Sequence, residues 1–278
     1  MGLDLALTNS NLVILVVSLA AAGILVGIMS GLLGIGGGGI LVPVLYETFG
    51  ALGVDDAIRM HMAVGTSLAV VGATSLRSFL AHRARGTVDT ALVRRLAVFV
   101  LIGALAGVVV ASHADSRVLR GLWVVLGTVM AAKLAFGRDD WRLGTEIPKS
   151  IAVEAYAVMV GFVSVLLSIA GAVYMVALMT LYGRPMLQSV GTSAGFGPFI
   201  AVPGMLGFIW AGWGVSGAPA LSLGYVNLMG AAIILPASLL AAPLGVRLAH
   251  GLSKRTLELA FAGFLLLVSM RFLASLLA

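Results

Sequence analysis

Residues 31–45 read GLLGIGGGGILVPVL, and five of the six positions from 34 to 39 are glycine. Glycine brings no side-chain chemistry, and inside a helix it costs about 1 kcal/mol relative to alanine. The stretch nevertheless lies within the 42 residues from Leu5 to Tyr46, which contain no acidic or basic side chain. About 20 apolar residues are enough for one membrane-spanning helix. The motif therefore predicts an interrupted helix inside a membrane.

The composition of the chain agrees with a multi-pass membrane protein. Of its 278 residues, 60% are hydrophobic and 10% are charged, against about 25% charged residues in soluble domains. A second charge-free run covers residues 185–246. The formal charge of +6 comes from basic residues in short connections between apolar runs, so we expect a lipid bilayer and no nucleic acid as the partner. The chain has no cysteine, which excludes disulfides and thiolate metal sites.

Four pairs of short motifs recur in the same order in the two halves of the chain. VGIMSGLLGIGG (26–37) aligns with VGFVSVLLSIAG (160–171), AVGTS (63–67) with SVGTS (189–193), GTVD (86–89) with GYVN (224–227), and SRVLRGLWVVLG (116–127) with KRTLELAFAGFL (254–265). Such a repeat predicts a first transmembrane repeat (1–136), a cytoplasmic linker (137–150) and a second transmembrane repeat (151–278). We expect an all-α integral membrane fold with about ten apolar helical segments, five in each repeat.

The second segment of each repeat is too short to cross a bilayer. Residues 38–50 and 171–183 would span roughly 18 Å as helices, against a hydrocarbon core of about 30 Å, so we expect a broken helix or helical hairpin at the start of each repeat. If that hairpin makes an even number of crossings, the repeats are inverted and 13 of the 17 Lys and Arg residues fall on one side. Residues 77–95 contain five Arg, whereas residues 211–223 are uncharged. The positive-inside rule then places 77–95 inside, and both termini outside.

Inverted repeats with broken helices are typical of secondary transporters, whose substrate site lies where the helices break. A helix that begins near Ile40 would present unpaired N–H groups and the positive end of its dipole, which favours an anion. Pro43 suits the first turn of this helix. The stretch SIAGAVYMV (168–176) repeats the break, and the two GTS stretches supply hydroxyl donors. The predicted substrate-binding residues are Gly36, Gly37, Gly38, Gly39, Pro43, Thr66, Ser67, Ser168, Gly171, Ala172, Gln188, Thr192 and Ser193.

Simpler structural roles stay open for residues of the same types. Gly23, Gly27 and Gly31 recur every four residues, as in close packing of membrane helices. Serine and threonine hydroxyls in membrane helices commonly bond to the preceding turn. Lys133 and Arg271 fit long side chains that extend to the membrane interface.

Two further motifs imitate enzyme signatures. Gly34, Gly36 and Gly39 match G-x-G-x-x-G, but an apolar run of more than 20 residues precedes them in place of a strand. GTSAG (191–195) matches G-x-S-x-G without the strand–turn–helix context of a nucleophile elbow. The four histidines lie at segment ends, where solvation is a simpler role than metal binding. We therefore predict no enzyme, catalytic residue, metal site or cofactor, and an intramembrane hydrolase is the least favoured alternative.

The stretch GLLGIGGGGILVPVL, followed by AVGTSLAVV and RARGTVD, resembles the sulfite exporter TauE/SafE family of membrane permeases. The resemblance implies transport of sulfite, organosulfonates or related small anions across a prokaryotic cell (inner) membrane, and it implicates Gly36 to Gly39, Pro43, Thr66 and Ser67. The predicted function is a secondary transporter that works by alternating access, with an anion channel as the alternative. Glu47 and His61 are candidate proton-coupling residues, and a homo-oligomer is compatible with the sequence.

Overall fold

The computed structural model describes residues 9–33, 38–137, 142–169, 171–249 and 254–277. Within these ranges the chain forms eleven α-helices and one short β-hairpin, so the all-helical class is confirmed. In chain order the elements are α1 (Asn9–Leu33), α2 (Gly38–Ala51), α3 (Asp56–Ala84), α4 (Thr90–His113), α5 (Ser116–Phe136), α6 (Ile151–Leu166), α7 (Ala172–Leu181), α8 (Met186–Ala194), α9 (Gly197–Ala211), β1 (Ser222–Leu223), β2 (Val226–Asn227), α10 (Leu228–Ala249) and α11 (Lys254–Leu277).

One apolar run, residues 186–211, is formed by two helices in the structure. α8 ends at Ala194, and α9 begins three residues later at Gly197. Pro198, in the first turn of α9, has no N–H group to bond the carbonyl of Ala194. The backbone therefore turns at Gly195 and Phe196 before the helix resumes.

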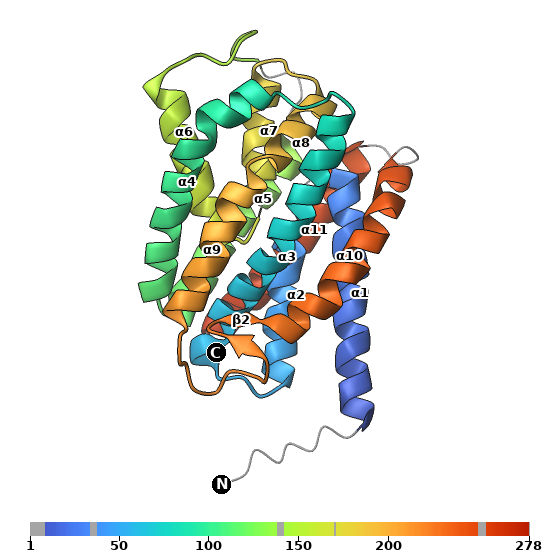
Figure 1. Ribbon diagram of the computed structural model, residues 1–278, viewed down its shortest axis with the longest axis vertical. Helices are drawn as coiled ribbons and strands as arrows, with labels where there is room; N and C mark the ends of the chain where they lie inside the picture. Colours follow the sequence, from blue (N-terminus) through green and yellow to red (C-terminus); the bar gives the residue numbers. More distant parts are fainter. Residues whose placement is uncertain (1–8, 34–37, 138–141, 170, 250–253, 278) are drawn as a thin grey trace.

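Most helices run along the long axis of the molecule, and their connections gather at its two ends (Figure 1). At one end, which we call the linker end, lie residues 85–89, 142–150 and 182–185. At the other, which we call the hairpin end, lie residues 52–55, 114–115 and 212–227, the last of these including the β-hairpin. α2 runs for about 20 Å from the interior to the hairpin end, and α7 runs for about 15 Å from the interior to the linker end.

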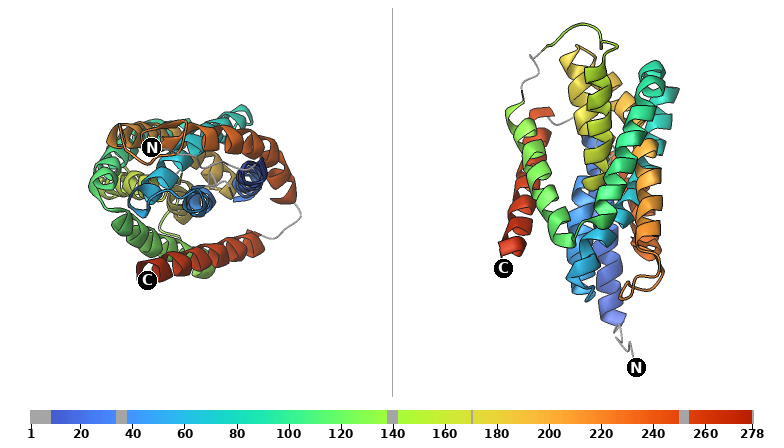
Figure 2. Two further views of the ribbon diagram at one scale, coloured as in Figure 1. Left: turned by 90° about the horizontal axis from the view of Figure 1, so that it is seen from below. Right: turned by 90° about the vertical axis from the view of Figure 1, so that its left-hand side faces the viewer.

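Helices from the two halves of the chain alternate in the packing. α1 packs along α10, α4 along α6, and α5 along α11, the last pair forming one flank of the molecule (Figure 2). The glycines of α1 permit its close approach to α10, because a Cβ on Gly23 would lie 2.7 Å from the carbonyl oxygen of Ile234 and one on Gly27 would overlap that of Ser238. The predicted packing role is thus confirmed for Gly23 and Gly27, while the contacts of Gly31 lie outside the described residues.

The outer surface is apolar, as in a protein surrounded by lipid. Val98, Val109 and Val125 are each 59% exposed, and Leu240 is 79% exposed, although large exposed apolar areas are rare on soluble monomers. Among the described residues, four helical runs are long and apolar enough to cross a membrane: α3, α4, α5, and residues 186–211, which join α8 and α9. Five shorter apolar helical stretches accompany them.

Candidate functional site

The two predicted helix breaks meet inside the molecule. α2 begins at Gly38, and a Cβ on this glycine would overlap the carbonyl oxygen of Ser168, in the break between α6 and α7. Ser168 has a φ of 53° and Gly171 a φ of 71°, so the backbone twice enters the left-handed region here. Val71 of α3 closes the contact, since its Cγ2 atom would lie 3.2 Å from the same Cβ. Two segments 130 residues apart in sequence therefore form one centre.

Both short helices start at this centre. α2 leaves it toward the hairpin end and α7 leaves it toward the linker end, so the N-terminus of each points inward. Gly171 precedes α7 without a side-chain hydrogen bond that caps the helix. The N–H groups in the first turn of a helix lack partners within that helix and carry a partial positive charge. The arrangement can attract an anion without a cationic side chain.

Pro43 lies deeper in α2 than predicted. It is the sixth residue of the helix, so its placement in the first turn is wrong. Because proline has no N–H group, the carbonyl of Gly39 has no donor from the following turn. Gly38 and Gly39 are buried at the start of the helix, whereas Gly36 and Gly37 lie outside the described residues. Gln188 is half-buried in the first turn of α8, and Ala172 is the first residue of α7.

The two predicted threonines each accept a hydrogen bond from the other half of the chain. The backbone N–H of Asn227 donates to Thr66 Oγ1 at 2.9 Å, and the backbone N–H of Asp89 donates to Thr192 Oγ1 at 2.9 Å. The side chains of Asn227 and Asp89 in turn accept from the N–H groups three residues later, at 2.7 and 2.9 Å. These contacts cap α10 and α4, so each threonine fixes the start of a helix in the other half.

The neighbouring serines behave differently. Ser67 and Ser193 are fully buried, and their hydroxyls have no hydrogen-bond partner among the described residues. The hydroxyls of Ser164 and Ser168, close to the break between α6 and α7, are also buried and unpartnered within the described part of the chain. An unsatisfied buried hydroxyl costs about 1–3 kcal/mol. Ser164 and Ser168 lie at the break, and unsatisfied hydroxyls there are groups that a polar ligand or water would complete.

Other hydroxyls in the same helices follow the ordinary pattern. Thr74 and Ser75 of α3 donate to carbonyls of the preceding turn at 3.0 Å, as Thr180 of α7 does at 2.9 Å and Ser189 of α8 at 3.0 Å. Bonding to the preceding turn, the simpler alternative for the hydroxyls, therefore holds for these four residues. It does not hold for Ser67 and Ser193, whose hydroxyls remain available to a ligand.

The two candidate proton-coupling residues lie in different surroundings. Glu47 is half-exposed and forms a 3.2 Å ion pair with Arg271. His61 is only 5% exposed, which makes the predicted solvation wrong for this residue. Its Nε2 lies 3.0 Å from the carbonyl oxygen of Ala114, and its ring stacks on Tyr225 with centroids 4.9 Å apart. Partial burial also raises the pKa of the Tyr225 phenol.

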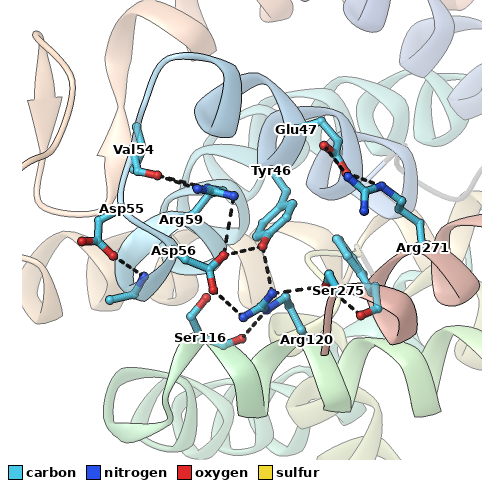
Figure 3. A network of polar contacts seen from close by, with 12 residues as sticks. Tyr46, Glu47, Val54, Asp55, Asp56, Arg59, Ser116, Arg120, Arg271 and Ser275 are labelled. Carbon is cyan, nitrogen blue, oxygen red and sulfur yellow. Dashed lines mark hydrogen bonds and ion pairs between the residues drawn. The ribbon is translucent and has the colours of Figure 1, made fainter. Parts of the chain in front are cut away.

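A polar network at the hairpin end was not predicted from the sequence (Figure 3). Arg120 of α5 is 3% exposed and donates to Asp56 Oδ2 at 2.5 Å, to the Tyr46 hydroxyl at 3.1 Å and to Ser275 Oγ at 3.2 Å. Tyr46 completes the triangle, since its hydroxyl donates to Asp56 Oδ1 at 2.6 Å. The partners lie up to 155 residues from Arg120, and no local pattern connects them.

The apolar, multi-pass helical fold is that of an integral membrane protein. The family model of the sulfite exporter TauE/SafE family matches residues 19–272, and the chain belongs to this family. A probable membrane transporter protein of Haemophilus influenzae is 28% identical over 89% of this chain and 94% of its own length. A probable membrane transporter protein of Methanocaldococcus jannaschii is 25% identical over 89% and 91%, and YjnA of Bacillus subtilis, also a probable membrane transporter protein, is 26% identical over 92% and 98%. No solved structure gives a significant match.

Proposed function

We propose that the protein is a secondary transporter that moves small sulfur-containing oxyanions, such as sulfite or organosulfonates, across the cell membrane by alternating access. The observation that carries the proposal is the contact between the two helix breaks, with Gly38 against Ser168, beside buried hydroxyls that lack partners. Sulfur oxyanions present several acceptor oxygens at once, which matches a site made of hydroxyl and amide donors. The family description agrees with this class of substrate.

The proposal includes two repeats of inverted orientation, bounded at residues 136 and 151. Its support is that contacts between the halves occur in equivalent pairs. The packing of α1 on α10 is equivalent to that of α6 on α4, and the Thr66–Asn227 hydrogen bond is equivalent to the Thr192–Asp89 hydrogen bond. The first half starts at the hairpin end and the second half starts at the linker end. Alternating access in such proteins is a movement of one group of helices against the other around a fixed central site.

The proposed orientation places the linker end in the cytoplasm and both termini outside. Arg83, Arg85, Arg142 and Arg184 belong to connections or helix ends at the linker end, whereas the connection 211–223 at the hairpin end has no charge. Cytoplasmic connections are enriched in Lys and Arg. A prokaryotic inner membrane is the corresponding location.

Counterflow in proteoliposomes tests the function. Vesicles loaded with unlabelled sulfite should accumulate labelled sulfite transiently, and sulfoacetate should replace sulfite inside the vesicle, while acetate at the same concentration should not. Counterflow requires a carrier that returns loaded, so a channel would give flux without this overshoot. Absence of saturable flux for every sulfur oxyanion tried would end the proposal.

A further inference from the structure

The network at the hairpin end joins four helices around one buried cation. Arg120 of α5 binds Asp56 at the start of α3, Tyr46 in α2 and Ser275 in α11 (Figure 3). Phe272 of α11 packs against this network: its ring lies edge-on to that of Tyr46, with the ring centroids 5.1 Å apart. These contacts bridge the α5–α11 pair and the helices α2 and α3, of which α2 leads inward to the central break.

The contacts are asymmetric between the two ends of the molecule. In the repeated motifs, Arg120 corresponds to Glu258, so the second half has an acidic residue where the first half has the arginine of the network.

A cavity lies at the linker end. The cavity measures about 550 Å³, and its lining includes Asp89, Arg95, Lys149 and Arg184. Asp89 donates its N–H to Thr192, the residue before Ser193, so the cavity borders the helix that carries one of the unpartnered hydroxyls. The linker end therefore has a cavity, whereas at the hairpin end charged and aromatic side chains connect the helices.

The solvent exposure of Arg120 and Asp56 suits an ion pair that breaks and re-forms. The side chain of Arg120 is 3% exposed and that of Asp56 is 47% exposed, so the carboxylate already reaches solvent at the rim. When α3 moves away from α5, water can solvate Asp56 at once, and Arg120 keeps the Ser275 hydroxyl and the carbonyl of Ser116. Separating an ion pair costs most when it leaves a buried charge without partners. Here Arg120 keeps two hydrogen-bond acceptors and Asp56 gains water, so the free-energy cost of separation is lower.

We infer that Arg120 and Asp56 form a latch that closes the hairpin end and opens when the transporter exposes its central site on that side. The inference rests on the proposed transport function and concerns its gating. Tyr46 positions both members of the latch, because its hydroxyl donates to Asp56 and accepts from Arg120.

Cysteine labelling tests the latch, because the chain has no cysteine of its own. Val42→Cys in α2 reports on the hairpin side of the break, and Val173→Cys in α7 reports on the linker side; both side chains are buried. Each reporter is combined with Asp56→Asn, which keeps the shape of the side chain and removes its charge. An impermeant maleimide should then label Val42→Cys at least tenfold faster, with labelling of Val173→Cys unchanged or slower.

The matched control is Arg271→Gln, which breaks the exposed ion pair between Arg271 of α11 and Glu47 of α2 and should leave both labelling rates unchanged. Tyr46→Phe should give an intermediate increase at Val42→Cys, and Asp56→Glu should restore slow labelling. Equal acceleration at both reporters would mean that the substitution merely loosens the fold, and no acceleration at Val42→Cys would equally overturn the latch. The assay needs no substrate, so it can succeed where sulfite counterflow fails and the two proposals are separable.

Discussion

Removal of the unpartnered serine hydroxyls should affect stability and anion affinity in opposite ways. Ser67 and Ser193 are buried, and their hydroxyls bond to none of the described residues. In the anion-free protein, Ser67→Ala removes a polar atom that has no partner. The free energy of unfolding should therefore stay constant or rise by up to about 1 kcal/mol, because replacing an unsatisfied group is nearly neutral or stabilising.

The anion-bound protein should respond in the other direction. A hydrogen bond to a charged group contributes about 1.5–3 kcal/mol, and each 1.4 kcal/mol corresponds to about a tenfold change in dissociation constant. Ser67→Ala and Ser193→Ala should each weaken sulfite binding by roughly 10- to 100-fold. Thermal unfolding with and without sulfite measures both effects on one sample, since a ligand that binds only the folded state raises the midpoint of unfolding.

Each helix offers its own matched control. Ser75 of α3 and Ser189 of α8 are buried serines whose hydroxyls donate to carbonyls at 3.0 Å. Their alanine variants should lower stability by about 0.5–1.5 kcal/mol and leave sulfite affinity unchanged. If Ser67→Ala and Ser75→Ala alter sulfite affinity equally, or if neither Ser67→Ala nor Ser193→Ala alters it, the assignment of these hydroxyls to the anion is refuted.

Three further outcomes are expected. Thr66→Val and Thr192→Val should each lower the free energy of unfolding by about 1–3 kcal/mol, because each leaves a backbone N–H unpaired; chemical denaturation measures this, and the double variant should show the sum. Gly27→Ala should lower the midpoint of thermal unfolding because its Cβ would overlap the Ser238 carbonyl, whereas Gly263→Ala, with open space around it, should be neutral or stabilising; equal effects would contradict the packing argument. Gly38→Val should abolish sulfite binding in equilibrium dialysis, and intact binding would place the anion elsewhere.

Hydropathy and glycine content were enough to predict the helices and their breaks. The expected half-helix 38–50 is α2, residues 38–51, and the expected segment 171–183 contains α7, residues 172–181. These predictions succeed because a chain in lipid must satisfy its backbone within helices, so apolar length determines where helices form. The interruption at Gly195 could not be predicted from Pro198, because proline also occurs within continuous helices. α10, for example, contains Pro236 and Pro243.

The roles of the polar side chains were harder to predict. The repeated motifs identified Thr66 and Thr192 as special, but a hydroxyl can accept as well as donate, and the sequence does not say which. Their partners lie 161 and 103 residues away. Arg120 and Asp56 are 64 residues apart and become neighbours only through the packing of α5 against α3. Long-range pairs of this kind leave no local pattern in a single sequence.

The exchanged threonine bonds have a consequence for synthesis of the protein. When the ribosome has completed α3, Thr66 is in place, but the backbone N–H that it accepts belongs to Asn227 and has not yet been made. In the second contact the donor is made first: the N–H of Asp89 is present before its acceptor, the hydroxyl of Thr192, has been synthesised. Each of these two hydrogen bonds therefore forms only when both halves of the chain are present.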